Sequence, residues 1–272
     1  MNLKKIKKIF FYTILILYSV ITIGPFLWAL YSSLRTAADV NKLTLDFTNL
    51  TFDNFTFIAT RFELGRWYVN SVVVAVCVTA GNLFFNSMAG YALARIKFPG
   101  RNAMFMFILG TMMIPGQITM IPVYILLTKL GWVNSYVGLV VPFMSGSFGV
   151  FLMRQFFMGI PIELEEAAKL DGLGRFGTFV RIVLPISKAA LTSQLILIFM
   201  GNWNSFIMPS ILATSQEMFT LPVGLNALQN QYYSFQNQVM AGAMYLSIPM
   251  IILFIVFQRQ FIEGISATGS KG

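Results

Sequence analysis

Six stretches of the 272-residue chain contain no Asp, Glu, Lys or Arg, and each is long enough for a helix to cross a membrane. About 20 residues of apolar α-helix span the hydrocarbon core of a bilayer. The stretches cover residues 9–34, 67–94, 102–128, 130–153, 189–216 and 218–258. This pattern confines the chain to folds in which several helices are embedded in a membrane.

Two other fold classes fit the sequence poorly. Only 11% of the residues are charged, whereas soluble domains carry about a quarter. A transmembrane β-barrel would show alternating segments of about 10 residues, and continuous runs such as IILFIVF do not alternate. We therefore predict an all-α integral membrane protein with six transmembrane helices, at about residues 9–32, 68–94, 103–127, 136–156, 187–209 and 240–258.

The segments between the predicted spans differ in character. Residues 33–66 are too polar to insert and predict a small external cap, and residues 211–239 form a second outer segment that contains many Gln, Asn and Tyr residues. Prolines inside the spans predict kinks or interruptions, which neighbouring protein tolerates at membrane depth. The stretch MMIPGQITMIPVY should be the most interrupted of these. The prolines inside the predicted spans are Pro25, Pro115, Pro122, Pro142 and Pro249.

The basic residues predict the orientation. Lys4, Lys5, Lys7 and Lys8 precede the first apolar run, which has no cleavage pattern after it and is therefore predicted to be a retained span. Placing this end in the cytoplasm puts fourteen of the nineteen Lys and Arg residues inside and five outside. Cytoplasmic loops carry such an excess, so both termini are predicted to be cytoplasmic.

Several kinds of chemistry lack the residues they need. There is no histidine, and the single cysteine, Cys77, allows no intrachain disulfide. No phosphate-binding loop of the G-x-x-x-x-G-K-[ST] type occurs, so the chain should not hydrolyse ATP. Helical spacing scatters the acids of residues 163–171, which argues against a metal or catalytic site. The net charge of +9 gathers in short loops beside spans, as a topology signal does, which argues against nucleic acid binding.

A charged loop, residues 157–186, separates the fourth and fifth predicted spans, and its local signals are helical. Pro161 suits a first helical turn, Gly172 suits a left-handed stop, and three acidic residues suit the positive helix end: Glu163, Glu165 and Glu166. Leu164, Ala167, Ala168 and Asp171 then fall on one side, and a second short helix at 174–183 would end near Pro185. We predict a helical hairpin along the membrane whose small-residue face is turned to the cytoplasm. An interfacial helix that only anchors the loop is the alternative.

The loop also resembles a known family. Glu166-Ala167-Ala168, three residues, Gly172, nine residues and Ile182-x-Leu184-Pro185 match the EAA-loop signature of permease subunits of bacterial binding-protein-dependent ABC importers. The resemblance covers most of the chain from about residue 67. The segments MIPGQITMIPVYILLTKLGWVNSYVGLVVP and GNWNSFIMPSILA are similar to the carbohydrate-uptake branch, in particular to its shorter permease, such as that of the maltose system.

The resemblance implies a type I ABC importer permease whose loop is a coupling helix that docks on a cytoplasmic ATPase. The residues that carry over to this role are Glu165, Glu166, Ala167, Ala168, Asp171, Gly172 and Pro185. It also implies a second permease, two identical or different ATPase subunits that bind ATP and Mg²⁺, an extracellular solute-binding protein and a carbohydrate substrate in the bacterial cytoplasmic membrane. No cofactor is expected in this chain. The implied division is 1–66, then the transmembrane domain 67–259, then a cytoplasmic tail 260–272.

Neutral polar residues inside the spans are candidates for the solute path. Together with an aromatic platform at Trp203 they would suit an uncharged sugar; they are Asn82, Asn86, Gln117, Gln194, Asn202 and Asn204. Interhelical hydrogen bonding explains Asn and Gln in spans equally well. A permease for a polyol or glycerol phosphate is an alternative. An ion-coupled secondary carrier is another, although such carriers usually need charged residues in their spans.

Overall fold

The computed structural model describes the backbone of residues 3–40, 42, 44–231 and 236–269, and the side chains of residues 4–40, 42, 44–227 and 236–258. Residues 270–272 of the predicted tail and 232–235 of the second predicted outer segment lie outside the described residues. All regular elements in the described part are helical, apart from one isolated β-bridge between Arg35 and Leu50.

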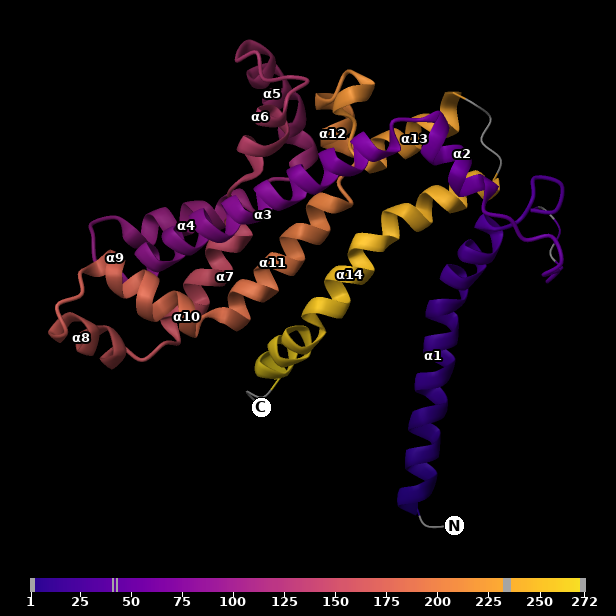
Figure 1. The fold of residues 1–272 in the computed structure, drawn as a ribbon. Coiled ribbons are helices and arrows are strands. Elements are labelled where there is room, and N and C mark those ends of the chain that lie inside the picture. The colour runs from indigo at the N-terminus through magenta and orange to yellow at the C-terminus, as the bar shows by residue number, and fades with distance from the viewer. Residues whose placement is uncertain (1–2, 41, 43, 232–235, 270–272) are drawn as a thin grey trace. The chain divides into compact units, whose positions relative to one another are not determined.

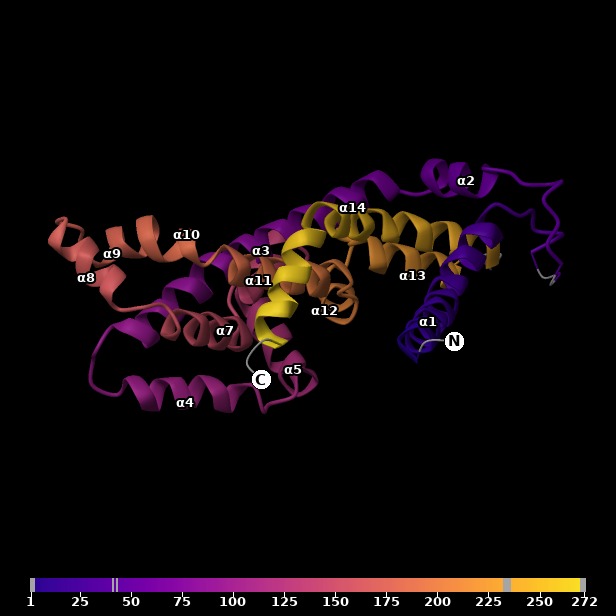
Figure 2. The ribbon, with the colours of Figure 1, turned by 90° about the horizontal axis from the view of Figure 1, so that it is seen from below.

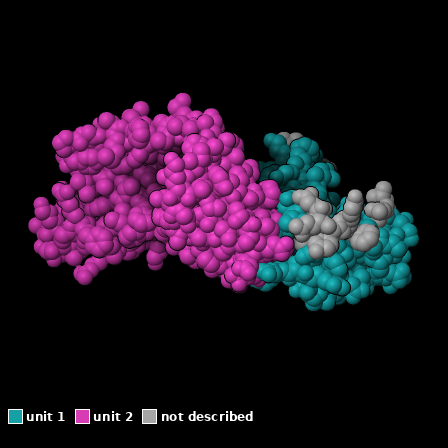
Figure 3. Space-filling view, turned by 90° about the horizontal axis from the view of Figure 1, so that it is seen from above, with its two compact units in different colours: residues 1–65, 224–249 teal, residues 66–223, 250–272 magenta. Residues whose placement is uncertain are grey.

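The chain divides into two compact units, which Figure 3 shows in different colours. Unit 1 holds residues 1–65 and 224–249, and unit 2 holds residues 66–223 and 250–272. The predicted division at residues 66 and 259 stays a prediction.

Four helical stretches are long and apolar enough to cross a membrane: Lys4–Ser33 in α1 (Leu3–Ser33), α3 (Leu64–Arg95), Tyr136–Met158, and Gln236–Gln258 in α14 (Gln236–Gly269). Two bent helix pairs raise the number to as many as six if each pair is one span. Pro25 and Pro249 lie inside α1 and α14, and both helices continue through them.

The predicted break in MMIPGQITMIPVY is confirmed. Helix α4 (Arg101–Thr111) ends before this stretch, α5 (Gly116–Lys129) begins inside it at Gly116 and continues through Pro122, and the two helices are bent by 98°. Pro115 is the N-cap of α5 and has an extended ψ of 131°. A proline has no backbone N–H to donate, so a helix start is where it fits best.

The fourth and fifth spans are more irregular than predicted. The region 136–156 consists of α6 (Tyr136–Val140), the 3₁₀ turn η1 (Val141–Phe143) and α7 (Ser147–Met158), with Pro142 in the 3₁₀ turn. The prediction of one helix over 187–209 was wrong, because α11 (Lys188–Trp203) ends first and α12 (Ile207–Leu212) follows. Pro209 lies in the first turn of α12, where no N–H is needed.

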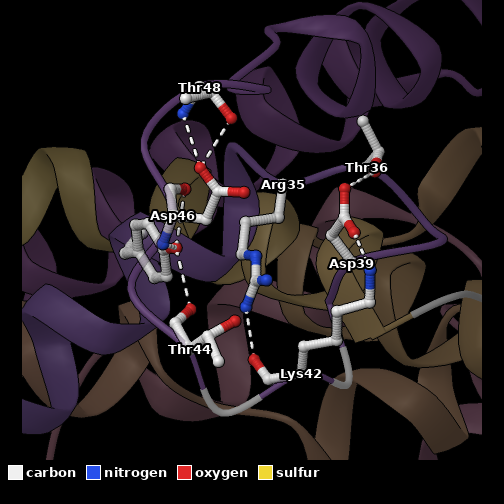
Figure 4. A network of polar contacts seen from close by, with 8 residues as sticks. Arg35, Thr36, Asp39, Lys42, Thr44, Asp46 and Thr48 are labelled. Atoms are coloured by element: carbon white, nitrogen blue, oxygen red, sulfur yellow. Dashed lines mark hydrogen bonds and ion pairs between the residues drawn. The ribbon is translucent and has the colours of Figure 1, made fainter.

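In unit 1, residues 34–52 and helix α2 (Asp53–Arg61) form a small folded segment, whose predicted location outside the membrane stays a prediction. Arg35 is 2% exposed and donates to the Lys42 carbonyl, as Figure 4 shows. Hydrogen bonds from Lys42 and Thr36 hold the pKa of Asp39 below its ordinary value of 3.8. Hydrogen bonds from Thr48 likewise lower the pKa of Asp46. Both carboxylates therefore stay ionised at lower pH than free aspartates.

In unit 2, the start of α3 is fixed to the segment after α12. This segment contains the turn η3 (Gln216–Met218), and α13 (Leu221–Gln231) follows. Trp67 Nε1 donates to the Gln216 carbonyl at 3.0 Å, and Asn70 Nδ2 donates to two carbonyls, Glu217 and Phe219, each at 2.8 Å. These bonds satisfy carbonyls of irregular backbone, which a membrane environment would otherwise leave without partners.

Small residues let α3 and α7 approach closely. A Cβ atom on Gly90 would lie 2.8 Å from Met153 Cβ, and one on Gly149 would lie 2.0 Å from Asn86 Nδ2. Interfaces between membrane helices are enriched in such residues, because dispersion contacts rather than water exclusion hold them together. The α3–α7 contact is therefore sterically matched and should not tolerate added volume.

Candidate functional site

The loop predicted to couple the chain to an ATPase is a helical hairpin, residues 163–186. Its first helix is α8 (Glu163–Leu170), with three acidic residues in the first turn. Gly172 follows with φ at 84°. Its N–H bonds the Lys169 carbonyl at 3.1 Å, and the Leu173 N–H bonds the Ala168 carbonyl at 2.9 Å. This pair of bonds is a Schellman stop, which requires a left-handed residue, so the predicted role of Gly172 in ending the helix is confirmed.

The second arm is longer than the predicted 174–183 and is not uniform. It consists of α9 (Arg175–Thr178), a π-helical segment η2 (Phe179–Val183) and α10 (Leu184–Ile186). The chain then bends by 79° at Ser187 to enter α11. Pro185 lies in the first turn of α10, and Ser187 donates to the Val183 carbonyl at 2.6 Å. The bend thus comes two residues after Pro185, the last residue of the motif.

Apolar packing fixes the second arm to the rest of unit 2. Phe179 and Val183 are 4% and 1% exposed and belong to a buried cluster of Tyr91, Met153, Phe157, Ile160, Phe179, Val183 and Ala190. The rings of Tyr91 and Phe179 lie 5.0 Å apart between centroids. This cluster joins the arm to α3, α7 and α11, so a movement of the hairpin would be transmitted to those helices.

Glu165 connects the first arm to the end of α3. Its Oε1 lies 2.8 Å from Arg95 Nε, and both side chains are only 13% exposed. The Tyr91 hydroxyl donates to Glu165 Oε2 at 3.0 Å, and Arg95 also donates to the Ile160 carbonyl. The Glu165 carboxylate therefore faces its own chain, and we assign it the task of positioning α8.

The predicted small-residue face is only partly correct. Ala167 is exposed, but Ala168 is 3% exposed because it packs under the second arm, where its carbonyl ends the helix. The outer surface of the hairpin instead carries apolar side chains: Leu170 is 91% exposed and Phe176 is 65% exposed. Exposed apolar side chains of this size mark a surface that contacts a protein partner or the membrane.

The outer surface of the hairpin also carries the remaining polar candidates. Glu166, Asp171 and Gly172 are exposed beside Ala167. Among the described residues, no three His, Cys, Asp or Glu side chains lie where they could hold a metal ion.

Sequence reasoning missed four residues of the hairpin site: Tyr91, Arg95, Leu170 and Phe176. Arg95 is one of the basic residues that predict the orientation, and its position directly after a charge-free stretch could also have indicated a partner across the loop. Leu170 and Phe176 stand on either side of the Gly172 turn, and apolar residues beside a turn glycine are a signal of this kind of surface.

Two residues predicted for the solute path, Asn82 and Asn86, are buried and hold the broken fourth span together. Asn82 Nδ2 donates to the Phe143 carbonyl at 2.6 Å. Asn86 Oδ1 accepts bonds from Ser145 Oγ and from the Gly146 N–H, both at 3.0 Å. These contacts satisfy backbone groups that the break between η1 and α7 leaves open, so they favour the interhelical alternative.

Trp203 does not present an open aromatic face, which corrects the prediction of a platform. It is 1% exposed, stacks on Phe199 at 6.0 Å and meets Tyr68 edge-on at 5.5 Å. Asn202 donates to the Ile198 carbonyl of its own helix at 2.9 Å and lines a cavity of about 70 Å³. Gln194 is 1% exposed and points its amide at the Asn82 carbonyl. These three side chains serve packing in this conformation.

Gln117 and Asn204 are brought together in a pocket of about 600 Å³. The α5–α12 pocket is lined by Gly116, Gln117, Thr119, Met120, Val123, Phe143, Asn204, Ser205, Phe206, Ile207 and Met208. It exists because α4 and α5 are bent apart and because α11 ends at Trp203. Both Gln117 and Asn204 are exposed in it, and no charged residue lines it. Its chemistry suits an uncharged solute with hydroxyl groups.

The hairpin and the α5–α12 pocket lie at different levels along α3. In Figures 1 and 2, α8 and α9 stand at one end of α3, and α5 and α12 stand further along it. Helix α3 has 32 residues, or roughly 48 Å at 1.5 Å per residue. The hairpin contacts this helix at Arg95, whereas Phe143 of the pocket lining accepts a hydrogen bond from Asn82, near the middle of the helix.

Comparison with known proteins identifies the family to which this architecture belongs. The family model "Binding-protein-dependent transport system inner membrane component" matches residues 86–266. The chain belongs to this family. It is a family of transport components rather than of enzymes. The matched residues include the hairpin and the α5–α12 pocket.

Relatives agree with this assignment. The permease is 36% identical over 259 residues to the arabinooligosaccharides transport system permease protein AraQ of Bacillus subtilis, covering 93% of this chain and 92% of that one. It is 29% identical to the lactose transport system permease protein LacG of Rhizobium radiobacter, covering 93% of each. A crystal structure of a bacterial ABC transporter that imports the acidic polysaccharide alginate contains a chain with a TM-score of 0.83 and 24% identity, covering 95% of this chain and 98% of that one. That likeness shows the fold, a type I ABC permease.

Proposed function

We propose that the permease is one transmembrane subunit of a bacterial carbohydrate importer in the cytoplasmic membrane. It crosses the membrane six times, each bent helix pair counting as one crossing, and both termini are cytoplasmic. The excess of basic residues on one side of the spans supports this orientation.

The importer would contain a second permease, two ATPase subunits and an extracellular solute-binding protein. ATP and Mg²⁺ would be bound by the ATPases, and this chain would hold no cofactor of its own. ATP-driven closure of the ATPases would move the hairpin and, through the Tyr91–Phe179–Val183 cluster, helices α3, α7 and α11.

The observation that carries the proposal is the exposed surface of the hairpin. Leu170 and Phe176 are 91% and 65% exposed, while Glu165 and Phe179 below them fix the hairpin to unit 2. A rigid element that presents apolar side chains and an exposed carboxylate, Glu166, is what a protein partner needs for docking. An interfacial helix that only anchors its loop would bury the same apolar side chains in the bilayer surface, so association with the ATPase subunits is the measurement that separates the two roles.

The α5–α12 pocket supports an uncharged sugar as the solute. Its polar lining consists of neutral amide and hydroxyl groups, from Gln117, Thr119, Asn204 and Ser205. Relatives named for arabinooligosaccharides and for lactose transport neutral sugars. The absence of charge in the described lining disfavours glycerol phosphate, which would need a basic group, and leaves polyols as the second candidate.

The test is uptake into vesicles that contain the complete importer with saturating binding protein. We expect transport of labelled neutral oligosaccharides to require ATP and to disappear when the ATPase subunits are inactivated, while an ionophore leaves it unchanged. Uptake that collapses with the ionophore and survives ATPase inactivation would show an ion-coupled carrier. Competition by unlabelled polyols and glycerol phosphate then separates the solute classes.

A further inference from the structure

The turn between α3 and α4 carries a basic pocket that neither the hairpin nor the solute path uses. It has a volume of about 280 Å³ and is lined by Lys97, Phe98, Gly100, Arg101, Asn102 and Ala103. Gly100 has φ at 80°, and a Cβ there would meet nothing within 4 Å. The pocket is therefore open to the surroundings at the place where a membrane-crossing helix ends and the next begins.

The positive charge at this turn is not balanced within the described part of the chain. The ion pairs found there are Lys42–Asp39 and Arg95–Glu165, so Lys97 and Arg101 have no carboxylate partner. Arg154 adds a third cation nearby; its guanidinium lies 3.8 Å above the Phe105 ring, and its Nε donates to the Leu93 carbonyl. Unpaired cations at the end of a span attract an anionic ligand.

The pocket is held in place by the fold. Phe98 packs against the buried cluster of Leu93, Phe105 and Val150. The Arg101 N–H bonds the Phe98 carbonyl at 3.3 Å, and Arg101 Nη1 reaches the Ile96 carbonyl at 3.5 Å. A ligand would therefore find Arg101 already oriented, which reduces the entropy lost on binding.

An apolar surface continues from the pocket along α4. Met106 and Phe107 follow Ala103 by three and four residues, which places them on the same helix face. Their side chains are 64% and 75% exposed. A ligand with an anionic head and an apolar chain would match the pocket and this surface together.

We infer that the α3–α4 turn binds the headgroup of an anionic phospholipid, with an acyl chain along Met106 and Phe107. Basic pockets at the ends of transmembrane helices bind phosphate headgroups in this way. The inference rests on membrane insertion, which family membership provides, and not on the identity of the solute.

A photoactivatable phosphatidylglycerol provides the test, with the complete importer in nanodiscs. We expect cross-links within residues 96–107, and the double variant Lys97→Gln/Arg101→Gln should reduce them about fivefold for each cation removed. Lys129→Gln removes an exposed cation from another turn and is the matched control. Basal ATPase activity and the thermal unfolding midpoint of both variants confirm assembly.

Two further measurements decide the nature of the ligand. A phosphatidylcholine probe should label this segment much less than phosphatidylglycerol, and inorganic phosphate at constant ionic strength should not compete. Equal labelling by both lipids, or unchanged labelling of the double variant, overturns the inference. Efficient competition by inorganic phosphate would assign the pocket to a soluble anion and would overturn it as well. Each of these outcomes is independent of whether the importer carries a sugar.

Discussion

Arg95 Nε lies 2.8 Å from Glu165 Oε1, and this contact joins the C-terminal end of α3 to the first helix of the hairpin. Arg95 makes a second bond to the Ile160 carbonyl, whereas Glu165 is also held by the Tyr91 hydroxyl. The two ends of the contact are thus each supported by a further bond, and the hairpin cannot rotate without breaking them.

This relationship predicts an unequal effect of the two neutral variants. Arg95→Gln loses the ion pair and the bond to Ile160, so it should cost more than Glu165→Gln; a buried polar group left without a partner costs about 1–3 kcal/mol. Both variants should lower the thermal unfolding midpoint and raise the number of ATP molecules hydrolysed per sugar transported. The double variant should cost less than the sum of the single ones, and strictly additive effects would show that the two side chains act separately. Glu166→Gln, at an exposed position, is the control for stability.

The hairpin surface predicts loss of ATPase association without loss of folding. Leu170→Ala removes an apolar group worth about 1.5–3 kcal/mol if docking buries it fully, so the affinity for the ATPase should fall by about tenfold or more. Ala167→Trp should block close docking by its size. Co-purification of the ATPase subunits measures both effects, and Lys188→Gln, outside the hairpin, should behave as wild type. Normal association and uptake by both hairpin variants would remove the coupling assignment.

The orientation is tested by single cysteines in a Cys77→Ala background, because Cys77 is exposed on the helix surface. Asp53→Cys and Arg175→Cys both place a thiol at an exposed position outside the long apolar helices. We expect an impermeant thiol reagent to label the first from outside intact cells and the second only after permeabilisation. Reversed labelling would place both termini on the outside.

The packing of α3 against α7 predicts that Asn86 and Gly149 are structural. Asn86→Leu leaves the Gly146 N–H and the Ser145 hydroxyl without their acceptor, at about 1–3 kcal/mol. Gly149→Ala places a methyl group about where Asn86 Nδ2 now lies, and overpacking of this kind costs typically about 1–3 kcal/mol. Both should lower the unfolding midpoint while the half-saturating sugar concentration of the surviving complex stays unchanged. A large shift in that concentration for Asn86→Leu alone would return Asn86 to the solute path. Asn202→Ala, whose amide bonds only its own helix, serves as the control.

The sequence allowed the general fold to be predicted because charge-free length is a direct consequence of the bilayer. The stop at Gly172 and the break at Pro115 were also predictable, since a left-handed turn and a missing N–H are local properties of those residues. The end of α11 at Trp203 was not predictable in the same way, because the charge-free stretch continues to residue 216 and only the backbone turn at Asn204 and Ser205 ends the helix.

Side-chain roles were harder to predict than helices. Asn82, Asn86 and Trp203 have the composition of a sugar site, but they pack against residues distant in sequence. Asn82 and Asn86 bond to residues 143–146, and Trp203 meets Tyr68 as well as the neighbouring Phe199. The face of α8 was misassigned at Ala168 for a related reason. A single helix period cannot show which side a second arm will cover, and the π-helical segment at Phe179–Val183 has no recognised signal in its sequence.

The α5–α12 pocket predicts which residues contact the solute. Gln117→Ala and Asn204→Ala each remove one neutral hydrogen-bonding group from the pocket wall, and such a bond contributes about 0.5–1.5 kcal/mol. Each variant should therefore raise the half-saturating sugar concentration by at most about tenfold, with assembly and basal ATP hydrolysis unchanged. Trp203→Ala should behave differently, because truncating a buried aromatic residue costs about 3–5 kcal/mol of stability.

Ser210→Ala removes a hydroxyl that bonds only the Ile207 carbonyl of its own helix and does not line the pocket, so it is the matched control. Uptake in vesicles with saturating binding protein is the measurement. Wild-type rates for Gln117→Ala and Asn204→Ala at every sugar concentration would assign the selective contacts to the second permease and the binding protein.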